Sequence, residues 1–331
     1  MMPKPLLRKP QRRRKEGCGM TVCVAAMAHY LGRTIVIAAS DRMITTGDIE
    51  FEQEQMKIQM LSSSIAIMVA GDLTVQTYLI HETIAWANEQ IAEQPTVWLK
   101  VKDVADVFRS RLVALKRAAA AEAILLPLNL DYDKLVSTEM SPGLAMQLAK
   151  EIFDFQIGTV EAIITGSDPT GVHIYVVDDR GVTCQDWVGF AAVGGGAWHA
   201  NSQLMFAGHV KTRDYPEVLM SVYSAKKRAE VAPGVGEATD MIVIGPGLGE
   251  SLTVGNPLMN LLGETYGEVR AQAETVRRNA NERIDAYFKE AVRDTPIQSQ
   301  TTPAIESGTG EKHGNEGEQV DGKELAHENG T

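Results

Sequence analysis

The sequence predicts an α+β protein in which two β-sheets pack face to face and helices cover their outer sides. Patterned segments run in the order strands, helices, strands, helices. Such segregated runs are typical of α+β proteins, whereas a doubly wound parallel sheet would show strict alternation. The chain has 331 residues, of which 44% are hydrophobic and 23% charged, so it can form one large core or two modest ones.

Strand-like segments come in pairs before residue 71. The runs TVCVAAMA (21–28) and TIVIAAS (34–40), joined by the turn HYLGR, predict a buried hairpin. A second pair, QMKIQML and IAIMVAG, flanks the turn SSS. After Gly71 the pattern becomes helical, and the apolar residues of 72–93 predict one helix face formed by Leu73, Tyr78, Leu79, Ile84 and Ile91.

The middle of the chain, about 95–150, has the pattern of a helical insertion, with helices expected near 97–121 and 142–153. Strands resume between 159 and 194, a helix follows the glycines at 194–196, and DMIVIG (240–245) predicts a further strand. We therefore expect a basic arm at 1–20, one domain at 21–255, a C-terminal helix at 256–292 and a disordered tail at 293–331.

Composition argues against several classes of function. The first nineteen residues carry a net charge of +6, so the rest carries −17 of the total of −11, which disfavours binding to nucleic acid. The cysteines Cys18, Cys23 and Cys184 have no metal-binding spacing, and we expect neither disulfides, metal nor cofactor. Without a secretory signal or an apolar run long enough for a membrane helix, we expect a cytoplasmic location and no membrane contact.

An ordered series of motifs resembles the β subunits of the proteasome and their bacterial HslV-like relatives. In chain order these are TVCV from Thr21, IVIAASDRMIT, a lysine in MKI, IMVAGD, GVHIYVVDDRG and VGGGAWHA. The resemblance runs from Thr21 to about Asp240, interrupted by the insertion. It implies the four-layer αββα sandwich of N-terminal-nucleophile (Ntn) hydrolases, with a threonine nucleophile at the free start of the first strand.

The resemblance assigns a catalytic role to four residues. Thr21 is the nucleophile once residues 1–20 are removed, either because translation starts at Met20 or because the precursor cleaves itself. Lys57 is the activating lysine, because it precedes Gly71, the glycine of the oxyanion hole, by the family's spacing of fourteen residues. A terminal threonine supplies its own base in its α-amino group.

The carboxylate partner of Lys57 is harder to assign. The family pattern A-A-D-x-R is here Ala-Ala-Ser40-Asp41-Arg42, so Asp41 would point to the opposite face of a regular strand unless a bulge restores it. We take Asp41 as the partner, with Ser40 as the occupant if the register is regular. The gap from Thr21 to Lys57 is longer than usual, and the turn HYLGR and the loop TTGDIEFEQ are expected to absorb the extra residues.

Further residues follow from the same resemblance. Met43 and Val69 line the first specificity pocket, which would favour apolar side chains, with ordinary core packing as the alternative for both. Gly195 stands where a supporting hydroxyl is expected at the substrate, and Glu230, Val235 and Asp240 are only approximate neighbours of the family's late aspartate and serine. We expect Cys23 to be a buried structural thiol, and Trp198 and His199 to serve packing.

The resemblance implies a threonine endopeptidase that acts on peptides or proteins and assembles as a ring or another homo-oligomer, with any ATPase partner undetermined. Two alternatives stay open from the sequence. One is a catalytically silent scaffold subunit of the same fold, and the other is an Ntn amidase for a small metabolite.

Overall fold

The computed structural model describes residues 21–46, 49–137 and 139–294, and the expected arm at 1–20 and the tail from 295 lie outside this part. The described residues contain two five-stranded antiparallel sheets and a two-stranded ribbon. The first sheet has the spatial order β10 (Phe190–Val193), β1 (Cys23–Tyr30), β2 (Arg33–Asp41), β11 (Thr239–Ile244) and β12 (Ser251–Thr253). The second has the order β5 (Gln59–Ser62), β6 (Ile65–Gly71), β7 (Val160–Asp168), β8 (Gly171–Val177) and β9 (Val182–Cys184).

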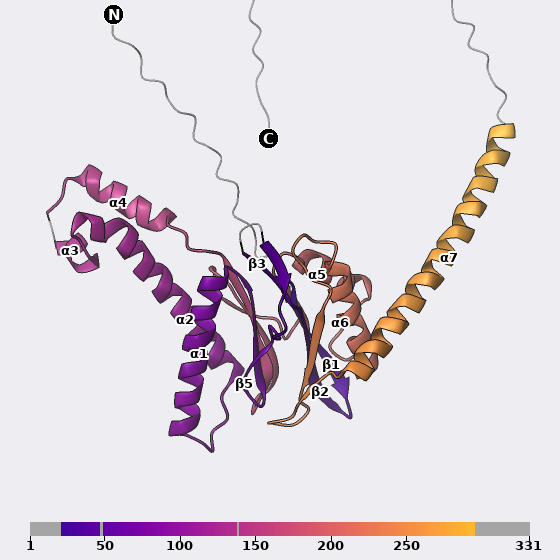
Figure 1. The fold of residues 1–331 in the computed structure, drawn as a ribbon, viewed down its shortest axis with the longest axis horizontal. Helices are drawn as coiled ribbons and strands as arrows, with labels where there is room; N and C mark the ends of the chain where they lie inside the picture. Colours follow the sequence, from indigo (N-terminus) through magenta and orange to yellow (C-terminus); the bar gives the residue numbers. More distant parts are fainter. Residues whose placement is uncertain (1–20, 47–48, 138, 295–331) are drawn as a thin grey trace, which may run out of the picture. The chain divides into compact units, whose positions relative to one another are not determined.

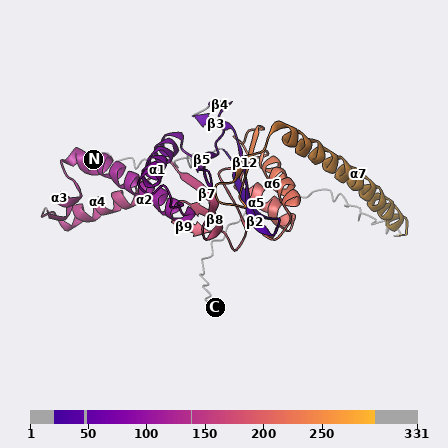
Figure 2. The same cartoon turned by 90° about the horizontal axis from the view of Figure 1, so that it is seen from below.

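Two groups of helices flank the sheets on opposite sides (Figures 1 and 2). On the second sheet lie α1 (Leu73–Glu93) and α2 (Val101–Ala120). The chain then forms a π-helical turn (Ala121–Leu125), a 3₁₀ turn (Leu126–Leu128), α3 (Tyr132–Ser137) and α4 (Pro142–Asp154). On the first sheet lie α5 (Ala197–Phe206) and α6 (Tyr215–Ala229). The mixed, antiparallel α+β architecture predicted from the sequence is thus confirmed.

Three apolar clusters hold these layers together, as the period-2 alternation of the strands requires. The first packs the even-numbered residues of β1, such as Val24, against α5 and α6. The second lies between the sheets and contains the odd-numbered residues of β1, such as Cys23, with Met68 of β6 and Ile163 of β7. The third packs the outer face of the second sheet against α1 and α2.

The predicted face of α1 was correct for Leu79 and Ile84, which lie in or against the third cluster, and wrong for Leu73, Tyr78 and Ile91. The residues that this helix buries fully are Leu79, Thr83 and Ala87, while Leu73 and Tyr78 are 40% and 45% exposed. The buried stripe keeps a helical spacing of four, but two of its members are a small residue and a threonine. The Thr83 hydroxyl donates to the Leu79 carbonyl at 2.7 Å, which removes the cost of burying it.

The expected loop TTGDIEFEQ is largely a β-ribbon. Its strands are β3 (Met43–Thr46) and β4 (Ile49–Glu52), paired antiparallel from Met43↔Glu52. The β1–β2 turn, in contrast, contains only Leu31 and Gly32, both with positive φ, because Tyr30 pairs directly with Arg33. Of the two segments expected to absorb the extra length before Lys57, the ribbon therefore holds most of it.

The chain divides into two compact units, at residues 1–272 and 273–331. The division falls within α7 (Asn256–Asp294), the C-terminal helix that the sequence predicts. In the first unit, Leu262 of α7 is buried in the first cluster. In the described part of the second unit the helix exposes most of its side chains, including Val276 and Phe288. None of the described helices combines the length and the apolar character needed to cross a membrane.

Candidate active site

Thr21 lies two residues before β1 and is only 5% exposed. Its hydroxyl donates to the Asp41 carboxylate and accepts from the Lys57 ammonium. Lys57 also forms an ion pair with Asp41, with 3.1 Å between Nζ and Oδ1, and donates to the Met43 carbonyl. The structure thus brings together Thr21, Asp41 and Lys57, three of the four residues proposed as catalytic. Thr21 and Lys57 are 36 positions apart in the chain.

Asp41 is fully buried at the end of β2 and accepts several hydrogen bonds. Oδ1 accepts the Val22 N–H at 3.0 Å, besides the contacts with Thr21 and Lys57, and Oδ2 accepts the N–H groups of Met43 at 3.0 Å and Gly236 at 3.1 Å. A buried carboxylate is stable only with such partners. These donors hold the Asp41 side chain in a single position.

The register argument for Ser40 was wrong. The pairing of β1 with β2 is regular from Cys23↔Ser40 to Tyr30↔Arg33, so no bulge brings Asp41 to the site. Thr21 precedes β1, so its side chain does not follow the alternation of the strand's side chains between the two faces of the sheet. Thr21 can therefore contact Asp41. Ser40 is fully buried, and its hydroxyl has no hydrogen-bond partner among the residues that the structure describes.

Lys57 lies in the segment between the ribbon and β5, and its side chain is 11% exposed. All three of its hydrogen-bond acceptors, on Thr21, Asp41 and Met43, belong to the candidate site. It is therefore not the surface lysine of an amphipathic strand.

Glycines surround the backbone of Thr21. A Cβ at Gly194, where φ is +91°, would overlap the Thr21 carbonyl oxygen, and that oxygen accepts the Gly196 N–H at 3.2 Å. Gly195, between them, is partly exposed. Gly71 ends β6 with φ of +132°, and a Cβ there would overlap the Thr159 carbonyl. Gly194 and Gly71 therefore admit only glycine.

The two residues assigned to the specificity pocket lie in different surroundings. The backbone of Met43 contacts both Asp41 and Lys57, so this residue adjoins the site. Val69 is 3% exposed and belongs to the third cluster, with Leu79 of α1. Val69 thus has the surroundings of a core residue, and its place in a specificity pocket stays a prediction.

The late residues differ from those that the resemblance suggested. Val235 is buried in the first cluster, Glu230 pairs with Lys226 and Lys227, and Asp240 binds Arg42 with distances of 2.6 and 2.9 Å. From this late part of the chain, the group that contacts Asp41 is instead the backbone N–H of Gly236.

Sequence reasoning missed Lys226, a fully buried lysine of α6. Its ammonium donates to the carbonyls of Gly236 and Glu237, each at 2.8 Å, and to Glu230 at 2.6 Å. Burial lowers the pKa of Lys226, while Glu230 and Asp41 oppose this shift. Because Gly236 binds Lys226 through its carbonyl and Asp41 through its N–H, Lys226 positions one of the donors on Asp41.

We expect Lys226→Met to lower the free energy of unfolding by about 2–4 kcal/mol, because two carbonyls lose their donor. If Gly236 positions Asp41, turnover by the remaining folded protein should fall as well. Lys227→Met is the matched control, since Lys227 binds the same segment through Glu237 at 3.2 Å but has no contact with Gly236 among its described bonds. Chemical denaturation and assays on folded protein measure both effects. Equal stability of the two variants would contradict this role for Lys226.

Cys23 is fully buried between the sheets, and burial raises the pKa of its thiol to about 12. A thiol in this state is a poor nucleophile. No group of three or more His, Cys, Asp or Glu side chains that could hold a metal ion occurs among the described residues.

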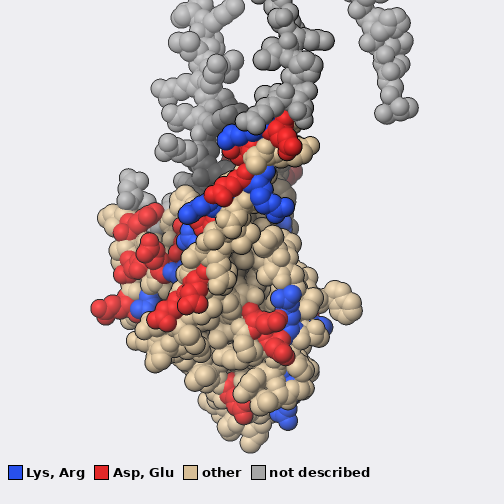
Figure 3. Space-filling view, turned by 90° about the vertical axis from the view of Figure 1, so that its right-hand side faces the viewer, with Lys and Arg blue, Asp and Glu red and all other residues tan. Residues whose placement is uncertain are grey.

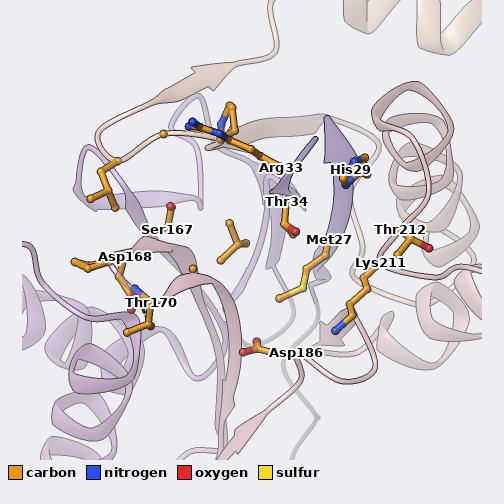
Figure 4. A pocket seen from close by; sticks show the side chains of 16 residues that line it. Met27, His29, Arg33, Thr34, Ser167, Asp168, Thr170, Asp186, Lys211 and Thr212 are labelled. Carbon is orange, nitrogen blue, oxygen red and sulfur yellow. Dashed lines mark hydrogen bonds between the residues drawn. The ribbon is translucent and has the colours of Figure 1, made fainter. Parts of the chain in front are cut away.

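A second threonine hydroxyl, on Thr170, contacts a histidine and an aspartate. Its Oγ1 lies 2.8 Å from His173 Nε2, and His173 Nδ1 lies 2.6 Å from Asp186 Oδ2. Figure 4 shows Thr170 and Asp186 in the lining of a cavity of about 690 Å³ near the other end of β1. However, the Thr170 hydroxyl and N–H both donate to Asp168, at 2.5 and 2.7 Å. Thr170 thus holds the β7–β8 turn, and no ammonium group contacts its hydroxyl among its described bonds, so Thr170 is a weaker candidate nucleophile than Thr21, which Lys57 contacts.

The charged residues of the face drawn in Figure 3 are interspersed, with acidic and basic side chains next to each other and wide uncharged areas between them. This face therefore shows no continuous basic surface among its coloured residues.

No protein-family model matches the chain, and a search of curated proteins found none similar to it.

Proposed function

We propose that this chain is an Ntn hydrolase of the proteasome β-subunit type, a threonine peptidase or amidase that uses Thr21 as its nucleophile. The observation that carries the proposal is the position of the Thr21 hydroxyl, in contact with both the Lys57 ammonium and the Asp41 carboxylate. A lysine, a buried aspartate and a threonine in mutual contact are suited to activating a hydroxyl group.

The arrangement of the layers supports the same proposal. The two sheets share the second cluster, and helices cover the outer face of each. This is the order of layers expected of the αββα sandwich, which we propose as the fold. Thr21 stands at the start of the strand that occupies the inner part of the first sheet, next to β2.

The first step of the proposed reaction is attack on the scissile carbonyl. The free α-amine of Thr21 takes the hydroxyl proton as the oxygen forms a bond to the carbonyl carbon. An α-amine has an ordinary pKa near 8, and the positive charge of Lys57 lowers this value by repulsion. The N–H of Gly71, at the end of β6, is the proposed donor to the oxyanion.

The second step releases the products. The α-ammonium returns its proton to the leaving amine, the C–N bond breaks, and an ester forms between Thr21 and the acyl group. Water, deprotonated by the same amine, then attacks this ester and restores the hydroxyl of Thr21. Asp41 holds Lys57 and the backbone of Val22 in place throughout.

The proposal requires a chain that begins at Thr21, because the nitrogen of Thr21 is otherwise part of a peptide bond to Met20. We expect protein expressed from Met1 to lose residues 1–20, as measured by intact mass and N-terminal sequencing. Thr21→Ala expressed in the same way separates the routes. It should retain the arm if the chain cleaves itself, and lose it if translation starts at Met20. Active protein that begins at Met1 or Cys18 would contradict the requirement.

The same preparation distinguishes the alternatives. A chain that keeps its arm and cleaves no amide would favour the scaffold. Processed protein that cleaves small amides but no peptide in a panel would favour a metabolite amidase.

Assembly into a homo-oligomer is part of the proposal, and α5 offers a surface for it. Its buried face consists of Ala200 and Leu204, whereas Trp198 and Phe206 are 86% and 87% exposed. The expectation that Trp198 packs within the chain was wrong, as was that for His199, which is also exposed. Large apolar side chains exposed on one helix are typical of protein contacts. Sedimentation of the processed protein, compared with Trp198→Ser, measures this contribution.

A further inference from the structure

A second cavity, of about 630 Å³, lies between the helical insertion and the start of β7. Its walls come from α2, from α4 and the segment that follows it, and from the turn between β8 and β9. Figure 1 shows α2 and α4 extending beyond the edge of the second sheet on this side. Helices of the insertion thus form part of the wall of this cavity.

This cavity shares a wall with the candidate active site. Glu161 lines the cavity, pairs with Ala70 in the sheet, and accepts the N–H of Gly194 at 3.0 Å. Gly194 in turn touches the carbonyl of Thr21. Thr159 also lines the cavity, and its carbonyl lies against Gly71. A peptide bound at Thr21 therefore needs only a few residues, at about 3.3 Å each, to reach the cavity.

The lining of the cavity carries four cations, Arg109, Lys116, Arg117 and Arg180. Within the described ranges none of them forms an ion pair with a carboxylate. Arg109 donates to the Asp179 carbonyl at 2.7 Å, Lys116 to the Gln156 side chain at 3.3 Å, and Arg117 lies over the Tyr132 ring at 4.6 Å. These neutral partners orient the cations and leave their charge uncompensated.

The carboxylates of the same lining are already engaged. Glu161 accepts from Gly194, and Asp178 accepts the N–H groups of Arg180 and Gly181 at 2.8 and 3.0 Å. Only Asp179 has no described hydrogen bond to its carboxylate, and it is exposed. The lining thus carries four cations against three carboxylates, Glu161, Asp178 and Asp179, which leaves a surplus of one positive charge in a domain whose overall charge is negative.

We propose that this cavity is a substrate subsite that binds an acidic side chain of a peptide, a few residues from the bond cleaved at Thr21. The inference rests on the proposed function, since it assigns the cavity to the same substrate. A carboxylate would gain charge-assisted hydrogen bonds from Lys116 and Arg117, while the apolar lining, Leu112 and Ile157, contacts its methylene groups.

Quenched fluorogenic peptides, amidated at the C-terminus and differing only by Glu or Gln at one position, test the subsite in the processed protein. We expect kcat/KM to be about tenfold higher for Glu at one or two positions on one side of the scissile bond. The ratio should fall towards one in Lys116→Gln/Arg117→Gln, and it should decrease with added salt. Lys116→Glu/Arg117→Glu should reverse the preference in favour of Lys.

Arg111→Gln is the matched control, because Arg111 belongs to the same helix but pairs with Glu82, at 3.8 Å, and does not line the cavity. It should keep the full preference for Glu. A ratio near one at every position in the wild type, or a preference that survives in Lys116→Gln/Arg117→Gln, would overturn the subsite. Preference for a free C-terminal carboxylate over both amidated peptides would also overturn it, since the ligand would then be a chain end.

Binding separates this proposal from the proposed function. Fluorescence anisotropy of a labelled Glu peptide and its Gln counterpart, on the same protein, needs no turnover. Tighter binding of the Glu peptide that depends on Lys116 and Arg117, without cleavage of any peptide, would support the subsite and refute the peptidase. Equal cleavage of the Glu and Gln peptides would support the peptidase and refute the subsite.

Discussion

Replacing Thr21 by alanine is expected to abolish turnover, with a loss on the order of a thousandfold or more, while the protein stays folded. The substitution removes the proposed nucleophile and leaves Lys57 and Asp41 paired with each other at 3.1 Å. That ion pair keeps both charges compensated, so the fold should persist. Steady-state assays and circular dichroism on processed protein measure the two effects.

Two variants control this experiment. Thr21→Ser keeps a hydroxyl at the chain terminus and should retain measurable activity. Thr170→Ala removes a second threonine hydroxyl, which contacts His173, and it should leave turnover unchanged because that hydroxyl serves a turn. Processed Thr21→Ala with wild-type turnover would exclude Thr21 as the nucleophile, and loss of activity in Thr170→Ala alone would transfer the role to Thr170.

Asp41→Asn is expected to affect both stability and activity. The carboxylate accepts bonds from Thr21, Lys57 and three backbone N–H groups, whereas an asparagine can accept only through its oxygen. At least one buried N–H then faces an amide donor, and Lys57 loses its counter-charge. We expect the free energy of unfolding to fall by about 3 kcal/mol or more, and turnover to fall on the order of a thousandfold.

Asp240→Asn provides the comparison, because Asp240 is also a nearly buried carboxylate but binds Arg42 and has no described contact with Thr21. It should lower stability with a much smaller loss of turnover. Denaturant titration together with assays on the folded fraction distinguishes the two. If both variants lose activity in proportion to stability, Asp41 has only a structural role.

Much of the fold follows from local patterns. The hairpins, the helix near 142–153 and the strand at 240–245 each depend on a periodicity that neighbouring residues carry themselves. The buried face of α1 does not follow from a local pattern. Thr83 and Ala87 are buried because their small side chains fit against a neighbouring element, and the sequence alone does not indicate which element this is. Trp198 was misplaced for the converse reason, since its size suggests burial but the face it lies on has no partner among the residues that the structure describes.

The candidate site was predictable in part. Thr21, Lys57 and Gly71 come from the spacing of motifs, and the structure brings Thr21 and Lys57 into contact. Gly236 and Lys226 were missed because one contributes only its backbone and the other belongs to a run of basic residues that resembles a solvated helix end. The only signal for Lys226 was its position in the helix, in line with the buried Val222 and Ala229.

The hydrogen-bond donors to Asp41 come from segments that span nearly the whole domain, so the candidate centre forms only when these segments are folded together. Its donors come from positions 22, 43, 57 and 236, and the last of them is 195 residues away in the chain. Contacts of such long range form only after the intervening segments have closed their loops. A nascent chain released before the segment around Gly236 would hold an incomplete and inactive centre. For the proposed peptidase, completion of folding would then be a second requirement for catalysis, beside the removal of residues 1–20.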